Sequence, residues 1–163
     1  MKFLEFADER VGLALAGTVF VNVLRRSLTM KQMAEVRRVV AKQQARGEAS
    51  ARGAITVLEL SALDSIDEEA RRDSARLMSE VRSAAAATVV EGRGFRAVAG
   101  RAIISGLYLV SRPPYQHRVF SDAEEGARWM GALVAGKPAA PTAKEISEAI
   151  AEARAAILSP KVD

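Results

Sequence analysis

Residues 54–60, Ala-Ile-Thr-Val-Leu-Glu-Leu, follow Gly53 and form a nearly continuous apolar run. Runs of this kind are typical of central strands in a sheet, because both faces of such a strand are covered. We therefore expect this strand to lie in the middle of a sheet that has helices packed against it. A chain of 163 residues has room for one such domain and is too short for two ordinary ones.

A second apolar stretch, residues 11–24, is interrupted by two glycines and Asn22. It is too short to cross a bilayer, and its β-branched residues favour a buried strand, which we expect to run from residue 11 to about residue 21. A short strand over residues 2–6 precedes it, and residues 7–10 form the turn between them. The chain therefore opens with two strands.

Helical periodicity and capping residues mark the helices. Capping boxes, in which a hydroxyl residue is followed three positions later by Glu or Gln, open four of them, at Thr29, Ser65, Ser121 and Thr142. The expected helices cover residues 29–47, 67–82, 95–111, 121–135 and 142–158, and further strands cover residues 86–90 and 118–120. The order β-β-α-β-α-β-α-β-α, plus an appended C-terminal helix, predicts an α/β fold with a single mixed, mostly parallel sheet flanked by helices.

The last helix is set apart from the rest of the chain. We expect residues 1–135 to form the α/β domain, residues 136–141 to form a linker rich in Pro, Ala and Gly, and residues 142–158 to form an accessory amphipathic helix. Its apolar stripe must be held by packing, so we expect the helix to dock on its own domain. Exchange between two copies, which makes a homodimer, is the alternative. The stripe consists of Ile146, Ile150, Ala153 and Ile157.

The composition argues against most catalytic classes. The chain has no cysteine and a single histidine, His117, so disulfides and thiolate chemistry are excluded and we expect no metal and no cofactor. His117 needs a nucleophile and an orienting acid to act as a general base, and no Gly-x-Ser-x-Gly elbow is present. Glu59, at the end of a buried strand, is a candidate site carboxylate, although a hydrogen bond to a neighbouring turn explains it equally well. We expect a protein that is not an enzyme.

The charge pattern bears on partners and location. The net charge is +4, and basic residues gather in residues 25–52. This stretch lacks the aromatic stacking residues of nucleic-acid binders, so a solvated helix face is favoured over a site for nucleic acid or anionic lipid. We find no signal-peptide pattern and no segment long enough to cross a membrane, and we expect a cytoplasmic protein.

Two stretches resemble the STAS domain family, the fold of bacterial anti-sigma-factor antagonists. Residues 57–67, Val-Leu-Glu-Leu-Ser-Ala-Leu-Asp-Ser-Ile-Asp, are similar to that family's strand, loop and helix start. Residues 118–130 resemble the closing strand and helix of STAS-like proteins, including a related group also likened to lipid-binding folds. The resemblance covers about residues 1–135. It implies a regulatory module in bacterial signalling whose partner is a protein, such as a kinase or a sigma-pathway regulator.

The sequence departs from the family where phosphorylatable members carry Asp-Ser-Ser. The matching residues are Asp67, Glu68 and Glu69, so a fixed carboxylate stands where a partner kinase phosphorylates a serine. The same residues also make an ordinary acidic first helical turn, which complements the helix dipole. We place the expected partner-binding surface at this loop and helix start and at the turn before the third helix. Its residues are Ser61, Asp64, Ser65, Asp67, Glu68, Glu69, Arg93 and Phe95.

A second hypothesis is that the chain binds a small molecule or lipid in a pocket beside the apolar third helix, residues 95–111. The preceding turn, Gly92-Arg93-Gly94, exposes backbone N–H groups that suit a phosphate. Its two glycines match neither a P-loop nor a dinucleotide fingerprint, and an ordinary strand-to-helix turn explains them. The turn before the third helix and the start of that helix bind a protein partner in the first hypothesis. In the second hypothesis they lie beside the ligand pocket.

Overall fold

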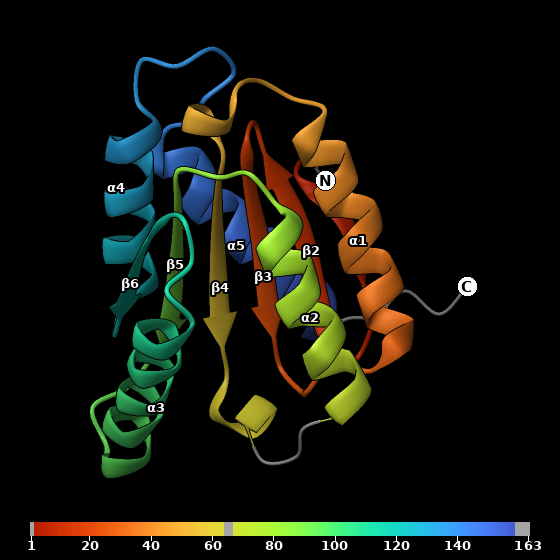
Figure 1. Ribbon diagram of the computed structural model, residues 1–163, viewed down its shortest axis with the longest axis vertical. Coiled ribbons are helices and arrows are strands. Elements are labelled where there is room, and N and C mark those ends of the chain that lie inside the picture. The colour runs from red at the N-terminus through yellow and green to blue at the C-terminus, as the bar shows by residue number, and fades with distance from the viewer. Residues whose placement is uncertain (1, 64–66, 159–163) are drawn as a thin grey trace.

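The computed structural model describes residues 2–63 and 67–158 (Figure 1). Within this part of the chain, one six-stranded sheet has its strands in chain order. The strands are β1 (Leu4–Ala7), β2 (Val11–Ala16), β3 (Val19–Leu24), β4 (Gly53–Leu58), β5 (Ala85–Val90) and β6 (Gln116–Phe120). The helices are α1 (Met30–Gln44), α2 (Glu68–Glu80), α3 (Phe95–Ser111), α4 (Ala123–Val134) and α5 (Ala143–Leu158), with short 3-10 turns at Ala49–Ala51 and Leu60–Leu63.

The first apolar stretch forms a hairpin of β2 and β3, so the prediction of one long strand over residues 11–21 is wrong. The chain turns at Gly17, whose φ of 54° is a left-handed conformation that glycine adopts without steric cost. Both strands are covered on their two faces and are apolar nearly throughout. Because neither strand alternates between polar and apolar residues, the pattern gave no sign of the turn.

From β3 onward the strands are parallel, and β4 lies between β3 and β5. The prediction that this segment is central is confirmed. The strand itself ends at Leu58, so the last two residues of the predicted range lie beyond it. The sheet is therefore mixed, with an antiparallel half formed by β1–β3 and a parallel half formed by β3–β6.

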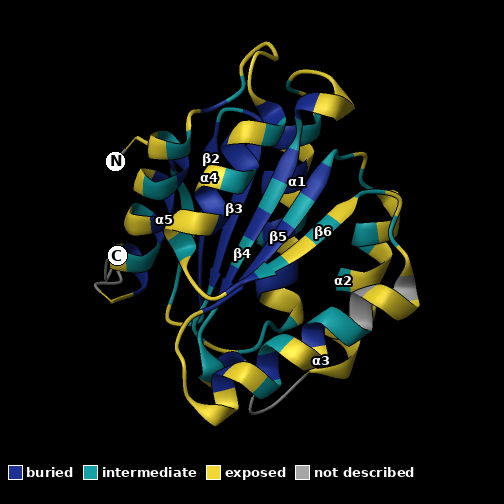
Figure 2. Ribbon diagram, turned by 90° about the vertical axis from the view of Figure 1, so that its left-hand side faces the viewer, coloured by how far each residue is buried: buried dark blue, intermediate teal, exposed yellow. Residues whose placement is uncertain are grey.

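The helices cover the two faces of this sheet unequally (Figures 1 and 2). On one face, α4 and α5 bury side chains such as Met130 and Ile146 against all the central strands. On the other face, α1 packs Met33 and Val39 onto β2 and β3. Helix α2 packs mainly against α1, and α3 lies at the edge of the sheet beside β5 and β6. The first face is thus fully packed, whereas the second is packed only over the hairpin.

The C-terminal helix α5 docks on its own chain, across β1, β2 and β3. The carboxylate of Glu152 accepts hydrogen bonds from the backbone N–H groups of Lys2, Phe3 and Leu4 at 3.0, 2.7 and 3.1 Å. Burial raises the pKa of Glu152, but these three donors outweigh it and hold the pKa below its ordinary value. The ionised side chain therefore fastens the N-terminal strand to the last helix.

Two of the four predicted capping boxes are present, at Thr29 and at Thr142. The other two predictions are wrong. Helix α2 has Asp67 as its N-cap, with Oδ1 accepting from the Ala70 N–H at 2.8 Å, and Ser65 lies outside the described residues. Helix α4 is capped by Asp122 and not by Ser121. In both helices a carboxylate nearer to the first turn accepts the exposed N–H groups and interacts with the helix dipole.

We expect Gly12→Ala to destabilise the protein, because its Cβ would overlap the backbone carbonyl of Ala153 on α5. Backbone cannot give way as a flexible side chain can, so the free energy of unfolding should fall by about 2 kcal/mol or more in a denaturant titration. Gly106→Ala is the matched control, since nothing lies within 4 Å of its added Cβ. That variant should be neutral or more stable, by up to about 1 kcal/mol, because alanine favours a helix. Equal stability of the two variants would contradict the close packing of α5 on β2.

Candidate functional site

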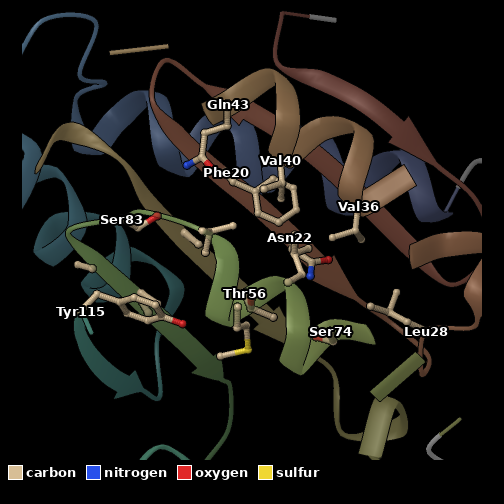
Figure 3. A pocket seen from close by; sticks show the side chains of 17 residues that line it. Phe20, Asn22, Leu28, Val36, Val40, Gln43, Thr56, Ser74, Ser83 and Tyr115 are labelled. Carbon is tan, nitrogen blue, oxygen red and sulfur yellow. The ribbon is translucent and has the colours of Figure 1, made fainter. Parts of the chain in front are cut away.

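A cavity of about 120 Å³ lies between the sheet and helices α1 and α2 (Figure 3). None of the described residues that line it carries a charged side chain. The polar lining side chains are Asn22, Gln43, Thr56, Ser74, Ser83 and Tyr115, and the larger apolar ones are Phe20, Leu28, Val36, Val40, Leu77, Met78 and Val81. A space of this composition suits an uncharged molecule that is mostly apolar.

Helix α2 is held mainly by α1, and the cavity lies between it and the sheet. The guanidinium of Arg37 on α1 binds Asp73 on α2 through two hydrogen bonds, Nη2 to Oδ1 at 2.7 Å and Nε to Oδ2 at 2.9 Å. This bond lowers the pKa of the Asp73 carboxyl and raises that of Arg37. Under α2 the sheet presents the small side chains of Ala54 and Ala86, which do not fill the gap.

A row of polar side chains crosses the sheet beneath this helix. Asn22 on β3 is in register with Thr56 on β4, and Thr56 is in register with Thr88 on β5. Asn22 is only 7% exposed, and its Oδ1 has no hydrogen-bond partner among the described residues. An unsatisfied buried polar atom costs about 1–3 kcal/mol, so its presence in the cavity wall calls for an explanation.

The other buried amide that lines the cavity, Gln43, has a structural role. Its Nε2 donates to the carbonyl oxygens of Thr18 at 2.8 Å and Gly53 at 2.7 Å, and so joins the end of α1 to the starts of two strands. The neighbouring Thr18 hydroxyl donates to the Ala51 carbonyl at 2.6 Å. Of the two amides, only that of Asn22 presents an unsatisfied acceptor.

His117 on β6 continues the polar row. Its Nε2 lies 3.0 Å from the Thr88 hydroxyl, and burial lowers its pKa to about 4. The ring is therefore neutral near pH 7, and a base of that pKa is a poor match for proton abstraction at neutral pH. The contact gives the buried Thr88 hydroxyl a hydrogen-bond partner.

Beside α3 lies a second, more open hollow of about 570 Å³. It is lined by Ser105, Leu109, Arg112, Pro113, Tyr115, His117, Arg118 and Val119. Tyr115 lines both this hollow and the cavity under α2, so the two spaces adjoin at that residue. Unlike the cavity, the hollow carries two arginines.

Of the residues expected to bind a partner, those that the structure describes belong to segments at the end of the sheet where the parallel strands end (Figure 1). The Ser61 hydroxyl donates to the Arg25 carbonyl, Asp67 caps α2, and Glu68 pairs with Arg71 at 2.8 Å. Glu69, Arg93 and Phe95 are exposed, whereas Asp64 and Ser65 lie outside the described residues. The 3-10 turn that carries Ser61 contacts α3, and Glu59 lies 4.0 Å from Arg25.

Sequence reasoning missed the cavity under α2. The signal was present, since Asn22 is the one polar residue within an otherwise apolar, β-branched strand. In the sequence alone, this asparagine is only an interruption of the apolar run. Its orientation toward α2 could not be known before the hairpin register was known, because a shift of one residue reverses the face.

Comparisons of the chain with models of known protein families, with curated proteins and with solved structures found no match. Across residues 2–63 and 67–158, no three His, Cys, Asp or Glu side chains are grouped so that they could hold a metal ion. No helix in the same ranges has the length and apolar character needed to cross a bilayer. The site must therefore be interpreted from its own chemistry.

We expect His117 to titrate with a pKa near 4 and not near the ordinary 6.5, because burial disfavours its charged form. As the only histidine, its ring protons can be followed by NMR without ambiguity. Between pH 6.5 and 4 the unfolded chain binds a proton at this ring that the folded protein does not, so the free energy of unfolding falls as the pH falls. His117→Gln should remove that part of the pH dependence, and an unchanged slope or a pKa near 6.5 would contradict the burial.

Proposed function

We propose that the chain is a non-catalytic module that binds a small, neutral, largely apolar molecule in the cavity under α2. The observation that carries the proposal is the Asn22 side chain, which is nearly buried, lines the cavity and has an Oδ1 without a hydrogen-bond partner among the described residues. A ligand with an O–H or N–H group would donate to this oxygen and offset the cost of burying it.

The lining narrows the class of ligand. Charged molecules are disfavoured because none of the lining side chains in the described part of the chain carries a charge that could compensate them. A volume of about 120 Å³ is close to that of engineered cavities, of roughly 150 Å³, that bind benzene. We therefore propose a small aromatic molecule of one ring or two fused rings with one donor group, and phenol and indole are suitable probes.

A binding role is favoured over catalysis by the chemistry of the polar row. The imidazole of His117 is the natural candidate for a base, but its pKa of about 4 leaves it poorly matched to that role. Its contact with Thr88 satisfies a buried hydroxyl. The row beneath α2 thus offers hydrogen bonds to a ligand and no activated nucleophile.

Asn22→Leu tests the proposal because it should change stability and binding in opposite directions. Removing the unsatisfied amide should raise the free energy of unfolding of the ligand-free protein by about 1 kcal/mol or more. The same change should abolish the increase in melting temperature that phenol or indole produces in the wild-type protein. Absence of that increase in the wild type would contradict the proposal.

Gln43→Met is the matched control, since it removes the other buried amide of the cavity wall. This change leaves the carbonyl oxygens of Thr18 and Gly53 without their donor, so stability should fall by about 1–3 kcal/mol. If Asn22→Leu destabilised the protein to the same extent, the Asn22 amide would have a structural role and the ligand proposal would fail.

A STAS-like protein-interaction module is the second candidate. It is favoured by the exposed positions of Glu69, Arg93 and Phe95, which belong to segments at the same end of the sheet as the acidic start of α2. On this proposal the fixed carboxylates of that turn replace the phosphorylated serine, and a protein partner binds this end of the sheet.

Phosphopeptide mapping of the protein isolated from its native cells tests the second candidate. We expect no phosphate on the segment 61–69, since a carboxylate stands at the modified position. Glu69→Ser is the gain-of-site variant, and it should become labelled by the kinase of a STAS partner. Phosphate on Ser61 or Ser65 of the unaltered protein would show that a switch is retained and would overturn the replacement.

A further inference from the structure

Helix α3 exposes an apolar face that the other described residues do not cover. Seven large hydrophobic side chains among the described residues are exposed, and five of them belong to α3. These are Phe95, Val98, Ile103, Leu109 and Val110, with exposed fractions of 87, 52, 63, 76 and 86%. Such a concentration on one helix marks an interaction surface and not scattered surface residues.

The five side chains lie on one side of the helix. At 3.6 residues per turn they fall within an arc of about 140°, together with Ala99, Ala102 and Gly106. The opposite side, with Ala97, Gly100 and Ile104, is buried. Helix α3 is therefore apolar on its buried side and also on the side directed to solvent at the periphery of the molecule (Figures 1 and 2).

The segment that carries this face contains positive charge only. Residues 92–121 contain five arginines and neither Asp nor Glu. Arg101 donates to the carbonyl oxygens of Val90 and Gly92, at 2.7 and 2.8 Å, and so anchors the helix start. The other four are exposed: Arg93 and Arg96 flank Phe95, and Arg112 and Arg118 line the same hollow as Leu109.

The exposed apolar side chains and the neighbouring arginines together indicate which kind of partner can cover this face of α3. A second copy of the chain, paired symmetrically, would bring the same arginines together, and like charges oppose such a contact. An anionic bilayer supplies both an apolar layer and phosphate groups at its boundary. We propose that α3 binds the surface of anionic membranes, with its apolar face in the acyl boundary and its flanking arginines among the headgroups.

Vesicle co-sedimentation of the full chain tests the proposal. We expect binding to phosphatidylcholine vesicles that contain about a quarter phosphatidylglycerol, and at least about tenfold weaker binding to pure phosphatidylcholine. Raising the salt from about 0.1 M to about 1 M should weaken the binding, because the screening length falls from about 10 Å to about 3 Å. Absence of binding to the anionic vesicles at low salt would overturn the proposal, as would capture of an acidic protein by this face without vesicle binding.

Two sets of variants separate the contribution of the apolar side chains to vesicle binding from the contribution of the charged side chains. The double variant Phe95→Ser/Val110→Ser alters only exposed side chains, so it should fold and should bind anionic vesicles at least about tenfold more weakly. Leu158→Ser on α5 is the matched control and should bind as the wild type does. Equal effects of the two, or none from the double variant, would overturn the assignment of the surface to α3.

Arg112→Glu should weaken binding to the anionic vesicles, whereas Lys137→Glu, exposed on the α4–α5 turn at the opposite end of the molecule, should not. Insertion itself can be read from Phe95→Trp, whose fluorescence should shift to the blue and be quenched by brominated acyl chains. The wild type, which has only Trp129, supplies the background. Unquenched fluorescence of the bound variant would place α3 outside the acyl boundary and overturn the proposal.

Discussion

The order of the strands determines where each helix lies. Three crossovers, through α1, α2 and α3, join neighbouring parallel strands and step in the same direction across the sheet. Because such crossovers are right-handed, all three helices lie on one face. The other face of β1–β6 then depends entirely on α4 and α5, and α5 covers the hairpin that α4 does not reach. The last helix is consequently part of the core, and Glu152 fastens it to β1.

The same constraint leaves the face that carries α1, α2 and α3 incompletely packed. Helix α1 occupies the hairpin, and α2 is bound to α1 through Arg37 and Asp73, so it stands above the small residues of β4 and β5. Helix α3 then lies at the edge of this face, beside β5 and β6. The cavity under α2 and the exposed side of α3 are two results of one topology, in which three helices share a face that they do not fill.

The sequence was sufficient to predict what depends on local pattern. The apolar run of β4 indicated a central strand, and the limits of α3 were predicted to the residue. The hairpin at Gly17 could not be predicted, because double-sided burial removes the alternation that marks a strand turn. The site could not be predicted either. The face to which Asn22 points and the gap beneath α2 are set by register and by helix placement, which are properties of the whole sheet.

The two proposed surfaces are adjacent through Tyr115, which lines both the cavity and the hollow beside α3. With α3 on a bilayer, that hollow lies close to the membrane surface, and its arginines Arg112 and Arg118 are placed where headgroup phosphates would be. An uncharged, mostly apolar ring partitions into the bilayer boundary, so the membrane would concentrate the class of ligand that the cavity suits. The uncharged lining around Asn22 and the charged rim around Leu109 then have complementary roles, one selecting the ligand and the other positioning the protein at its source.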